Sequence, residues 1–518
     1  MTAFTWLVPM VVVLPLVGAG VTLAAAGRTQ VQRAVSLTVL TLVLVTAGVL
    51  LYAADREGPQ VVAVGGWAPT EGIVLVVDRL AALMVIVSVV VTMGVLLYSI
   101  GQGRSSFDRE DDGQSPLPVF HPTLLVLIAG VATTFVSGDL FHIYVGFEML
   151  LAASFVLLTL GGTASRVQAG ITYVFVSLLS SLVFLAAIAL VYAATGTVNL
   201  ALLATRIQEI PHSTTVVLHL LLLVGFCTKA AVFPMSGWLP DSYPTAPAPV
   251  TAVFAGLLTK VGIYALIRTE TLLFPGNSLN TLLLWAALAT MVVGILGAVV
   301  QDDIKRMLSF TLVSHIGFLV FGIALGSQAG LSAAIFYTMH HITIQTTLFL
   351  VTGLVERVGG TTAASRLGGL ARVSPLLALL FFVPALNLAG IPPFSGFLGK
   401  VGLIQAGVDE GTWLAYLLVA GSVVTSLLTL YAIARVWGRA FWGQSEEGLT
   451  GAGPLRGGHH VALSTGLVVP TVALVAVGLG LTVVAGPLFE VTSRAALDLL
   501  VRTPYLFAVL GPELGVGL

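Results

Sequence analysis

Charge is scarce in this sequence. Charged residues make up 9% of its 518 positions, while 57% are hydrophobic. Soluble domains carry about 25% charged residues, so this chain cannot cover a water-facing surface of ordinary polarity. The 22 Lys and Arg residues are balanced by 23 Asp and Glu residues, which excludes a basic surface for nucleic acid. The single cysteine, Cys227, excludes an intrachain disulfide and a thiolate metal site.

Motifs for cofactor and nucleophile chemistry are also missing. The sequence has no paired-histidine metal helix, no glycine-rich phosphate loop after a strand and no nucleophile elbow. It also has no Lys or Arg before its first apolar stretch, unlike a cleavable signal peptide. We therefore expect an all-α polytopic membrane protein that is not an enzyme, with no cofactor and no bound metal.

Long apolar runs recur from the start of the sequence to about residue 486. A spanning helix needs about twenty predominantly apolar residues, and runs of that length predict fourteen transmembrane helices. They are 3–25, 32–53, 73–99, 119–136, 138–160, 168–193, 214–239, 245–268, 280–300, 305–326, 329–352, 373–404, 411–440 and 461–486. The breaks between them are short and rich in turn-forming and charged residues, so we expect no separate soluble domain.

Lys and Arg are distributed unevenly between alternate loops. Thirteen of them, from Arg28 to Arg456, fall in one set of loops, and six, from Arg56 to Arg502, fall in the other. Because cytoplasmic loops carry the excess of Lys and Arg, the first set is predicted to be cytoplasmic. With fourteen spans, both termini then lie outside, and the chain is predicted to be a multi-pass protein of the cell membrane.

One short motif occurs twice. The pattern Pro-x-Ser-Gly-aromatic-Leu starts at Pro234 in the seventh segment and at Pro393 in the twelfth. Five helices separate the copies, so they would cross the membrane in opposite directions, as inverted repeats of transporters do; a chance match of six positions is the alternative. A straight helix over 373–404 would be about 48 Å long, against a hydrocarbon core of about 30 Å. We expect it to break near Pro392 and Pro393.

Three lysines, Lys229, Lys260 and Lys400, fall inside apolar segments. A lysine in mid-bilayer costs about 2.5–3.5 kcal/mol, so each needs a compensating role. A structural tether remains an alternative for Lys229 and Lys260, and Lys400 could reach an interface if the broken helix shifts register. Glu148 has no Lys or Arg within reach on its own helix. It is predicted to handle protons, to form a structural ion pair or to stay neutral.

Several further titratable residues are candidates for a proton relay. His340 and His341 are adjacent, so they cannot share a helix face. We favour His341, because histidine titrates near neutrality and can pass a proton between its two nitrogens; His340 either packs or takes part. His315 could extend the chain or be a hydrogen-bonded core residue. Asp139 is expected to be a solvated helix-start acid, with a relay role as the alternative.

Three stretches carry a family resemblance: KAAVFPMSGWLPDSYPTAPAPVTAVFAGLLTKVGIYALIR at 229–268, DDIKRMLSFTLVSHIGF at 302–318 and LAGIPPFSGFLGKVGLI at 388–404. They resemble the antiporter-like membrane subunits shared by Mrp-type multisubunit Na+/H+ antiporters and the proton-pumping arm of respiratory complex I. In that family, two inverted five-helix units each contain a broken helix, which the resemblance assigns to the seventh and twelfth segments.

The resemblance implies a division of the chain into four parts. These are an N-terminal three-helix segment at 1–118, a first five-helix unit at 119–268, a second, inverted unit at 280–440, and a last helix with the C-terminal tail at 461–518.

The resemblance also implies roles for single residues. Glu148 matches the glutamate of the fifth helix, and Lys229 matches the broken-helix lysine with which it pairs. Lys260 matches a central lysine, His341 the histidine of the eleventh helix, and Lys400 the lysine of the second broken helix.

One position departs from the family pattern. Several relatives have a lysine one helical turn after the eleventh-helix histidine, where this chain has Gln345. Gln can hydrogen-bond water but cannot titrate, so a relay here would depend more heavily on His341, with Gln345 only as a water-binding member.

The implied function is that of a subunit of a secondary cation/proton antiporter, in which inward proton flow drives Na+ or Li+ outward. Its partners would be H+, Na+, the lipid bilayer and the other membrane subunits of the complex. One alternative is a redox-driven pump subunit of complex I or of a membrane-bound hydrogenase, which would use the same charged row. Another is an assembly scaffold whose ion path has decayed.

Overall fold

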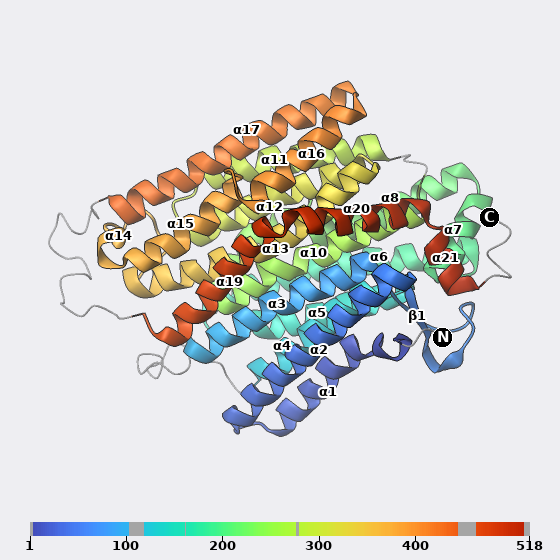
Figure 1. The fold of residues 1–518 in the computed structure, drawn as a ribbon, viewed down its shortest axis with the longest axis horizontal. Helices are drawn as coiled ribbons and strands as arrows, with labels where there is room; N and C mark the ends of the chain where they lie inside the picture. The colour runs from blue at the N-terminus through green and yellow to red at the C-terminus, as the bar shows by residue number, and fades with distance from the viewer. Residues whose placement is uncertain (1–3, 103–118, 161, 276–278, 444–462, 512–518) are drawn as a thin grey trace.

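The computed structural model describes residues 4–102, 119–160, 162–275, 279–443 and 463–511. Of the cations counted in the loops, Arg104, Arg109 and Arg456 lie outside these ranges. The described residues form an elongated bundle of helices whose axes run roughly along its long dimension (Figure 1).

The first half of the chain contains η1 (Thr5–Leu7), α1 (Met10–Ala24), α2 (Thr29–Glu57), β1 (Gln60–Ala63), η2 (Val64–Gly66), β2 (Val74–Val77), α3 (Arg79–Gln102), α4 (Phe120–Val136), α5 (Leu140–Thr159), α6 (Ala164–Thr195), α7 (Leu200–Arg206), η4 (Ile207–Glu209), α8 (His212–Ala230), α9 (Trp238–Ser242), η5 (Tyr243–Thr245) and α10 (Ala248–Leu272). The second half contains α11 (Asn280–Val300), α12 (Ile304–Ala324), α13 (Gln328–Gly359), α14 (Leu370–Val373), α15 (Pro375–Ala389), α16 (Ser395–Glu410), α17 (Trp413–Val436), η6 (Trp437–Trp442), α19 (Thr465–Val483), α20 (Ala485–Val501) and α21 (Thr503–Leu510).

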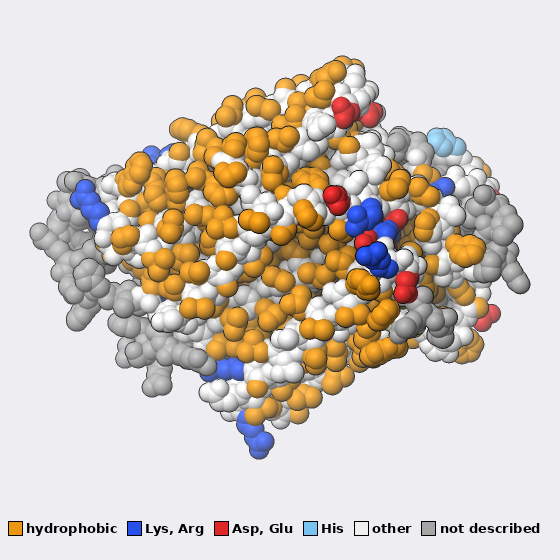
Figure 2. Space-filling view, viewed as in Figure 1, with side chains coloured by type: hydrophobic (Ala, Val, Ile, Leu, Met, Phe, Trp, Pro, Cys, Tyr) orange, Lys and Arg blue, Asp and Glu red, His pale blue; other side chains and the backbone are white. Residues whose placement is uncertain are grey.

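The apolar helices have the lengths that a bilayer requires. Among the described residues, eleven helices are long and apolar enough to cross a membrane, and Phe120–Val136 and Pro375–Ala389 are shorter apolar helices. Each of the fourteen predicted segments contains a helix. On the face seen in Figure 2, hydrophobic side chains predominate, and charged side chains occur only in small groups. The chain is therefore an all-helical polytopic membrane protein, and the regions that the structure describes add one small β-hairpin.

That hairpin corrects one expectation. The helix predicted for 73–99 begins only at Arg79, because Val74–Val77 form strand β2, which pairs antiparallel with β1. Three of the four β2 residues are valine, whose branched side chain favours a strand. Asp78 then ends the strand and starts the helix, since its Oδ1 accepts a hydrogen bond from the Ala81 amide at 2.9 Å.

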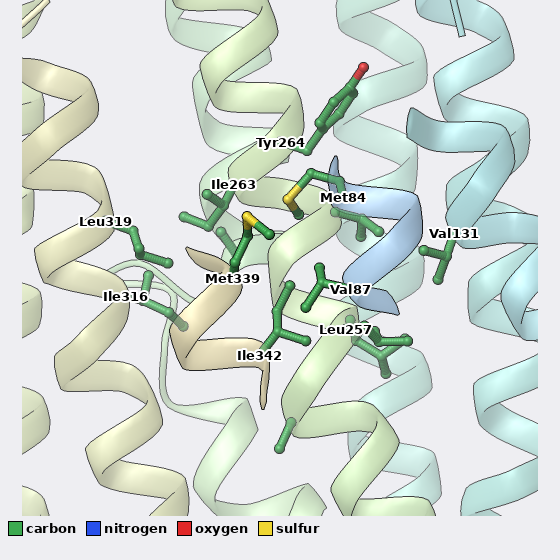
Figure 3. Packing of buried hydrophobic residues seen from close by; sticks show 14 of the residues in the cluster. Met84, Val87, Val131, Leu257, Ile263, Tyr264, Ile316, Leu319, Met339 and Ile342 are labelled. Carbon is green, nitrogen blue, oxygen red and sulfur yellow. The ribbon is translucent and has the colours of Figure 1, made fainter. Parts of the chain in front are cut away.

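Helix α10 forms the centre of the bundle. All of its residues are buried, and it packs against α13, α8, α3 and α12. Figure 3 shows the apolar side chains that meet there: Met84 and Val87 from α3, Leu257 and Ile263 from α10, Ile316 and Leu319 from α12, and Met339 and Ile342 from α13. The side chains of α10 therefore contact protein rather than lipid.

Two helical segments are interrupted where the repeated motif lies. After α8 the chain has no regular helix until Trp238, and after α15 none until Ser395. Each gap contains a cis X-Pro bond, at Pro234 and at Pro393. Side chains satisfy freed backbone amides in both gaps: Phe233 N–H donates to Thr290 Oγ1 at 3.0 Å, and Ser395 N–H donates to Thr482 Oγ1 at 2.9 Å. Irregular backbone at membrane depth requires such partners.

The end of the chain folds back over the bundle. Helix α20 packs against α13, α3 and α10, and α21 contacts α7 and β1. Figure 1 shows α21 at the same end of the bundle as the start of α1. Ala495, Ala496 and Leu499 form the buried face of α20, whereas its charged residue Arg494 is exposed and pairs with Asp55 at 3.0 Å.

Candidate functional site

Glu148 lies on α5 and Lys229 lies on α8, where Lys229 contacts the ring of Phe147 from α5. The Lys229 side chain is buried, and its Nζ lies 5.5 Å from the centre of the Phe147 ring, the residue before Glu148. Glu148 is half-buried. Glu148 Oε1 and Lys229 Nζ each have no hydrogen-bond partner within the described part of the chain, and no ion pair shorter than 4.0 Å joins them there. Among the described residues, Lys229 therefore lies against the Phe147 ring and forms no ion pair with Glu148.

Lys260 occupies the middle of α10, twelve residues from either end of the helix. Its side chain is 0% exposed, and Nζ donates one hydrogen bond, to the Ala255 carbonyl at 2.7 Å. An ammonium group has three donors, so this amine has capacity for further bonds.

Three rings from α12 and α13 are stacked beside α10. The His315 and His341 rings are 5.2 Å apart and inclined by 22°, and His315 Nδ1 bonds the Tyr337 hydroxyl at 2.8 Å. Both nitrogens of His341 and Nε2 of His315 are buried without a protein partner among the described residues. The structure thus brings together the two histidines that the sequence proposed for a relay.

His340 faces a different helix from its neighbour. Its Nδ1 bonds Ser395 Oγ at 3.0 Å, at the start of α16, and its ring lies 5.2 Å from that of Tyr337. Ser395 Oγ also donates to Asn387 Oδ1 at 3.3 Å. His340 therefore joins the ring cluster to the second interrupted helix, as expected for adjacent residues on different helix faces.

Lys400 lies across that interruption. Its side chain is 4% exposed, and Nζ donates to the carbonyls of Leu388 and Ala389 at 3.2 and 3.0 Å. These carbonyls are at the end of α15, where no following turn of helix uses them. The amine also lies 5.1 Å from the centre of the Phe318 ring. Lys400 is therefore held inside the protein rather than reaching an interface.

Gln345 is buried on α13 and bonds outside its own helix. Its Nε2 donates to the Leu308 carbonyl at 2.7 Å, and Oε1 has no partner among the described residues. Gln345 thus joins α13 to α12 while leaving one acceptor free.

Asp139 differs from the solvated acid that the sequence suggested. It is 6% exposed and forms the N-cap of α5, accepting the His142 amide at 2.8 Å. It also lines a cavity of about 740 Å³ that is open to the surface. The helix-start role is as expected, but the carboxylate is buried in the cavity wall.

Sequence reasoning missed a second buried titratable pair. His219 Nε2 and Glu270 Oε1 lie 2.6 Å apart and join α8 to α10, and the His219 ring stacks on Phe274 at 3.9 Å. Glu270 is two residues beyond Arg268, which forms a buried ion pair with Asp78 at 2.7 Å. The sequence shows His219 within one apolar segment and Glu270 just after another, but their spacing does not predict that the two side chains meet.

Comparison with known proteins shows the family. The model of the NADH:quinone oxidoreductase/Mrp antiporter transmembrane family matches residues 137–429, which is more than half of the chain. The chain is 36% identical over 512 residues to the D subunit of the Na+/H+ antiporter of Alkalihalophilus pseudofirmus, covering 97% of this chain and 99% of the relative. It is 33% identical to the corresponding D subunit of Bacillus subtilis, covering 84% and 87%.

Two solved structures have the same fold. A chain of the Mrp complex from Dietzia sp. superimposes with a TM-score of 0.89 at 33% identity, covering 99% of this chain and all of the other. A chain of a membrane-bound sulfane sulfur reductase, an archaeal respiratory membrane complex, superimposes with a TM-score of 0.86 at 25% identity, covering 98% and 100%.

Proposed function

Since the chain belongs to the NADH:quinone oxidoreductase/Mrp antiporter membrane-subunit family and is homologous to the D subunit of Mrp-type Na+/H+ antiporters, we propose that it carries protons along a row of Glu, Lys and His side chains at mid-membrane, coupled to the outward movement of Na+ or Li+. The observation that carries this proposal is the burial of Lys229, Lys260 and Lys400, at 5%, 0% and 4% exposure, inside membrane-spanning segments. Such amines are costly without a use.

In the first step, Glu148 and Lys229 form a charge pair that opens and closes. When closed, the carboxylate stabilises the ammonium form of Lys229; when open, desolvation favours the neutral amine. The lack of an ion pair between Glu148 and Lys229 among the described residues is consistent with an open state. Opening therefore releases a proton from Lys229, which passes to Lys260 through water.

In the second step, the proton crosses to the other unit through the stacked rings. Lys260 lies on α10, which packs on α13, where His341 and His340 lie. His341 stacks on His315, and the Tyr337 hydroxyl and Ser395 continue the polar groups towards α16 and Lys400. Each transfer needs partners within hydrogen-bond distance or one bridging water. Gln345 would hold such a water but not carry the charge.

The finer architecture belongs to the same proposal. We propose fourteen spans with both termini outside, and two inverted five-helix units at 119–268 and 280–440, between a three-helix segment at 1–118 and a last helix and tail at 461–518. The repeated motif supports the inversion, because both copies coincide with an interruption beside a buried lysine: Lys229 precedes Pro234, and Lys400 follows Pro393.

The partners proposed are the other subunits of the complex. By homology to the D subunit of the antiporter these are the A, B, C, E, F and G subunits, together with the lipid bilayer and the ions H+ and Na+. Lipid and neighbouring subunits would cover the exposed apolar side chains, such as Phe175 on α6 and Leu427 on α17, at 70% and 62% exposure. Because the proposed proton row ends at Lys400, close to the outer helices, the proton would leave the subunit laterally from there.

The test uses the whole complex in everted membrane vesicles. Glu148→Ala and Lys229→Ala should each abolish Na+-dependent proton flux, measured with a pH-sensitive dye, while the other subunits still co-purify. Asp241→Asn is the matched control, because Asp241 pairs with Arg306 at the surface, with side chains 61% and 47% exposed. Retained flux in both buried-site variants would refute the assignment.

A redox-driven pump is the second candidate. The observation that favours it is the superposition on a chain of an archaeal respiratory membrane complex. In that case, flux would need an electron donor and electron-transfer subunits rather than a Na+ gradient. Na+-dependent flux in vesicles without any electron donor would reject it, and the neighbouring genes would encode small antiporter subunits rather than quinone or iron–sulfur subunits.

A further inference from the structure

A large open cavity enters the first five-helix unit beside α5. It measures about 740 Å³ and is lined by the loop 69–73, the start of α5, one face of α6 and the turn 196–199. At about 30 Å³ for each water molecule, it can hold on the order of twenty waters. Exposed Phe141 and Tyr192 stand at its mouth, while Ile188 in its wall is 4% exposed. The cavity therefore brings water to side chains that are otherwise inside the bundle.

Two polar side chains of its wall are buried beside each other in the fold. Asp139 and Asn199 form an isolated antiparallel bridge and are 6% and 3% exposed. Asp139 accepts the His142 amide through Oδ1, and Asn199 Oδ1 accepts the amides of Ala201 and Leu202. Asn199 Nδ2 has no partner among the described residues. A buried carboxylate is costly in apolar surroundings, and an open cavity of this size has room for water that would stabilise Asp139.

Aromatic side chains connect the lining of this cavity to the surroundings of Lys229. The cavity reaches Leu185, next to Phe184. The Phe184 ring lies 5.6 Å from Phe147 and 4.8 Å from Phe226, and Lys229 Nζ is 5.5 Å from Phe147. Along α5, Glu148 is nine residues beyond Asp139, which is about 13.5 Å at 1.5 Å per residue. A series of aromatic contacts therefore runs from Phe141 in the cavity lining through Tyr144 and Phe184 to Phe147, beside Lys229.

Burial raises the pKa of the Asp139 carboxyl and favours proton exchange near neutral pH. Asp139 precedes the first residue of the α5 span, and burial raises the pKa of its carboxyl to about 6, although the amides of His142 and Phe141 oppose the rise. The titratable or charged groups around it are Glu71 in the loop, His142 on α5, Tyr192 on α6, Tyr505 on α21 and Arg206 on α7, which donates to the Thr195 carbonyl. A carboxyl of this kind changes protonation state within the working range of a membrane transporter.

The cavity, the buried carboxylate in its wall and the aromatic contacts that run from its lining to Lys229 lead to one inference. We propose that this cavity is the outer port of the first five-helix unit. Asp139 is the group that exchanges protons there with outside water, and the aromatic cluster of Phe147, Phe184 and Phe226 is the gate between this port and the Glu148 and Lys229 pair. This inference rests on the proposed function and on the predicted outside location of the start of α5.

Water access is tested by cysteine labelling in intact cells. Cys227→Ser removes the native thiol, and Ile188→Cys or Ala187→Cys then introduces one cysteine on α6. Ile188 lines the cavity, whereas its neighbour Ala187 is 0% exposed and does not. A charged, membrane-impermeant thiol reagent added outside should label the cysteine at 188 and not that at 187. Lack of labelling at 188, or equal labelling at both positions, overturns the port.

The role of the carboxylate is tested by flux in the reconstituted complex. Asp139→Asn keeps a good N-cap and should lower Na+-dependent proton flux by about a hundredfold, with loss of an inflection near pH 6 in the pH profile of wild type. Asp139→Glu should retain most of the flux. Glu209→Gln is the control, an exposed carboxylate on η4 beside α7. Unchanged flux and pH profile in Asp139→Asn overturn the inference.

The same assay separates this inference from the proposed function. If Glu148→Ala abolishes flux but Asp139→Asn does not alter it, the port is wrong and the proposed proton row stands. If neither variant alters flux, the proposed function itself fails.

Discussion

Gly262 lies where α10 meets the end of α8, two residues after Lys260 and against Ala230, the neighbour of Lys229. A Cβ atom at Gly262 would lie 2.7 Å from the Ala230 nitrogen and 3.0 Å from its Cα and Cβ. Ordinary van der Waals contact begins at 3.4 Å, so the nearest pair is 0.7 Å too close. Two of these three atoms are backbone, so no rotamer change relieves the contact. Gly262→Ala must move the end of α8 away from α10.

The expected effect is larger on transport than on stability. Overpacking a well-packed contact costs about 1–3 kcal/mol, which a bundle of this size tolerates. Misplacing reacting groups by about 1 Å can cost about a hundredfold in rate. Because the displacement here falls between the segments that carry Lys229 and Lys260, we expect Na+-dependent proton flux to fall by about tenfold while the complex still assembles.

The measurement compares Gly262→Ala with Gly480→Ala. Gly480 lies on α19, and a Cβ there has nothing within 4 Å, so this control adds the same methyl group without displacement. Flux is measured in everted vesicles at matched protein levels, and assembly is measured by co-purification. Wild-type flux in Gly262→Ala would refute the reasoning that close packing of α8 on α10 sets the distance for transfer.

Two further predictions concern buried groups. Asp78→Asn leaves Arg268 buried without its counter-charge and should destabilise the protein by about 3–5 kcal/mol. The loss is measured as a lower melting temperature of the purified complex. Arg306→Gln breaks an exposed pair and should cost less than about 1 kcal/mol, so equal shifts in melting temperature would contradict this ranking. His341→Gln should lower flux by about a hundredfold or more. Gln345→Leu removes a water-binding amide that does not titrate, so it should lower flux less than His341→Gln does. A larger loss in Gln345→Leu would reverse the roles given to the two residues.

The interruption of the seventh and twelfth segments illustrates what a sequence can and cannot show. For the twelfth segment, proline positions and segment length predicted a break, because proline lacks an amide donor and a bilayer limits helix length; for the seventh, the break was implied by the family resemblance. The partners of the freed backbone groups were not predictable. Thr290 and Thr482 supply them from α11 and α19, and these contacts join residues more than fifty positions apart in the chain.

Asp139 shows the same limit for a single side chain. Its place before an apolar run indicated a helix start, and the structure has it as the N-cap of α5. Its burial follows from strand β2, the turn at 196–199 and α21, all of which cover the start of α5. The strand was itself mistaken for helix, because four apolar residues carry no period that separates the two structures.

The sequence by itself determined the membrane-spanning class, the approximate limits of the helices and the importance of the buried lysines, since hydrocarbon imposes length and penalises charge wherever a residue lies along the chain. Only the tertiary structure decided which charges meet. It stacked His315 on His341, paired His219 with Glu270 and held Glu148 apart from Lys229. Such contacts depend on how helices distant in sequence pack, and the local pattern of each helix does not contain that information.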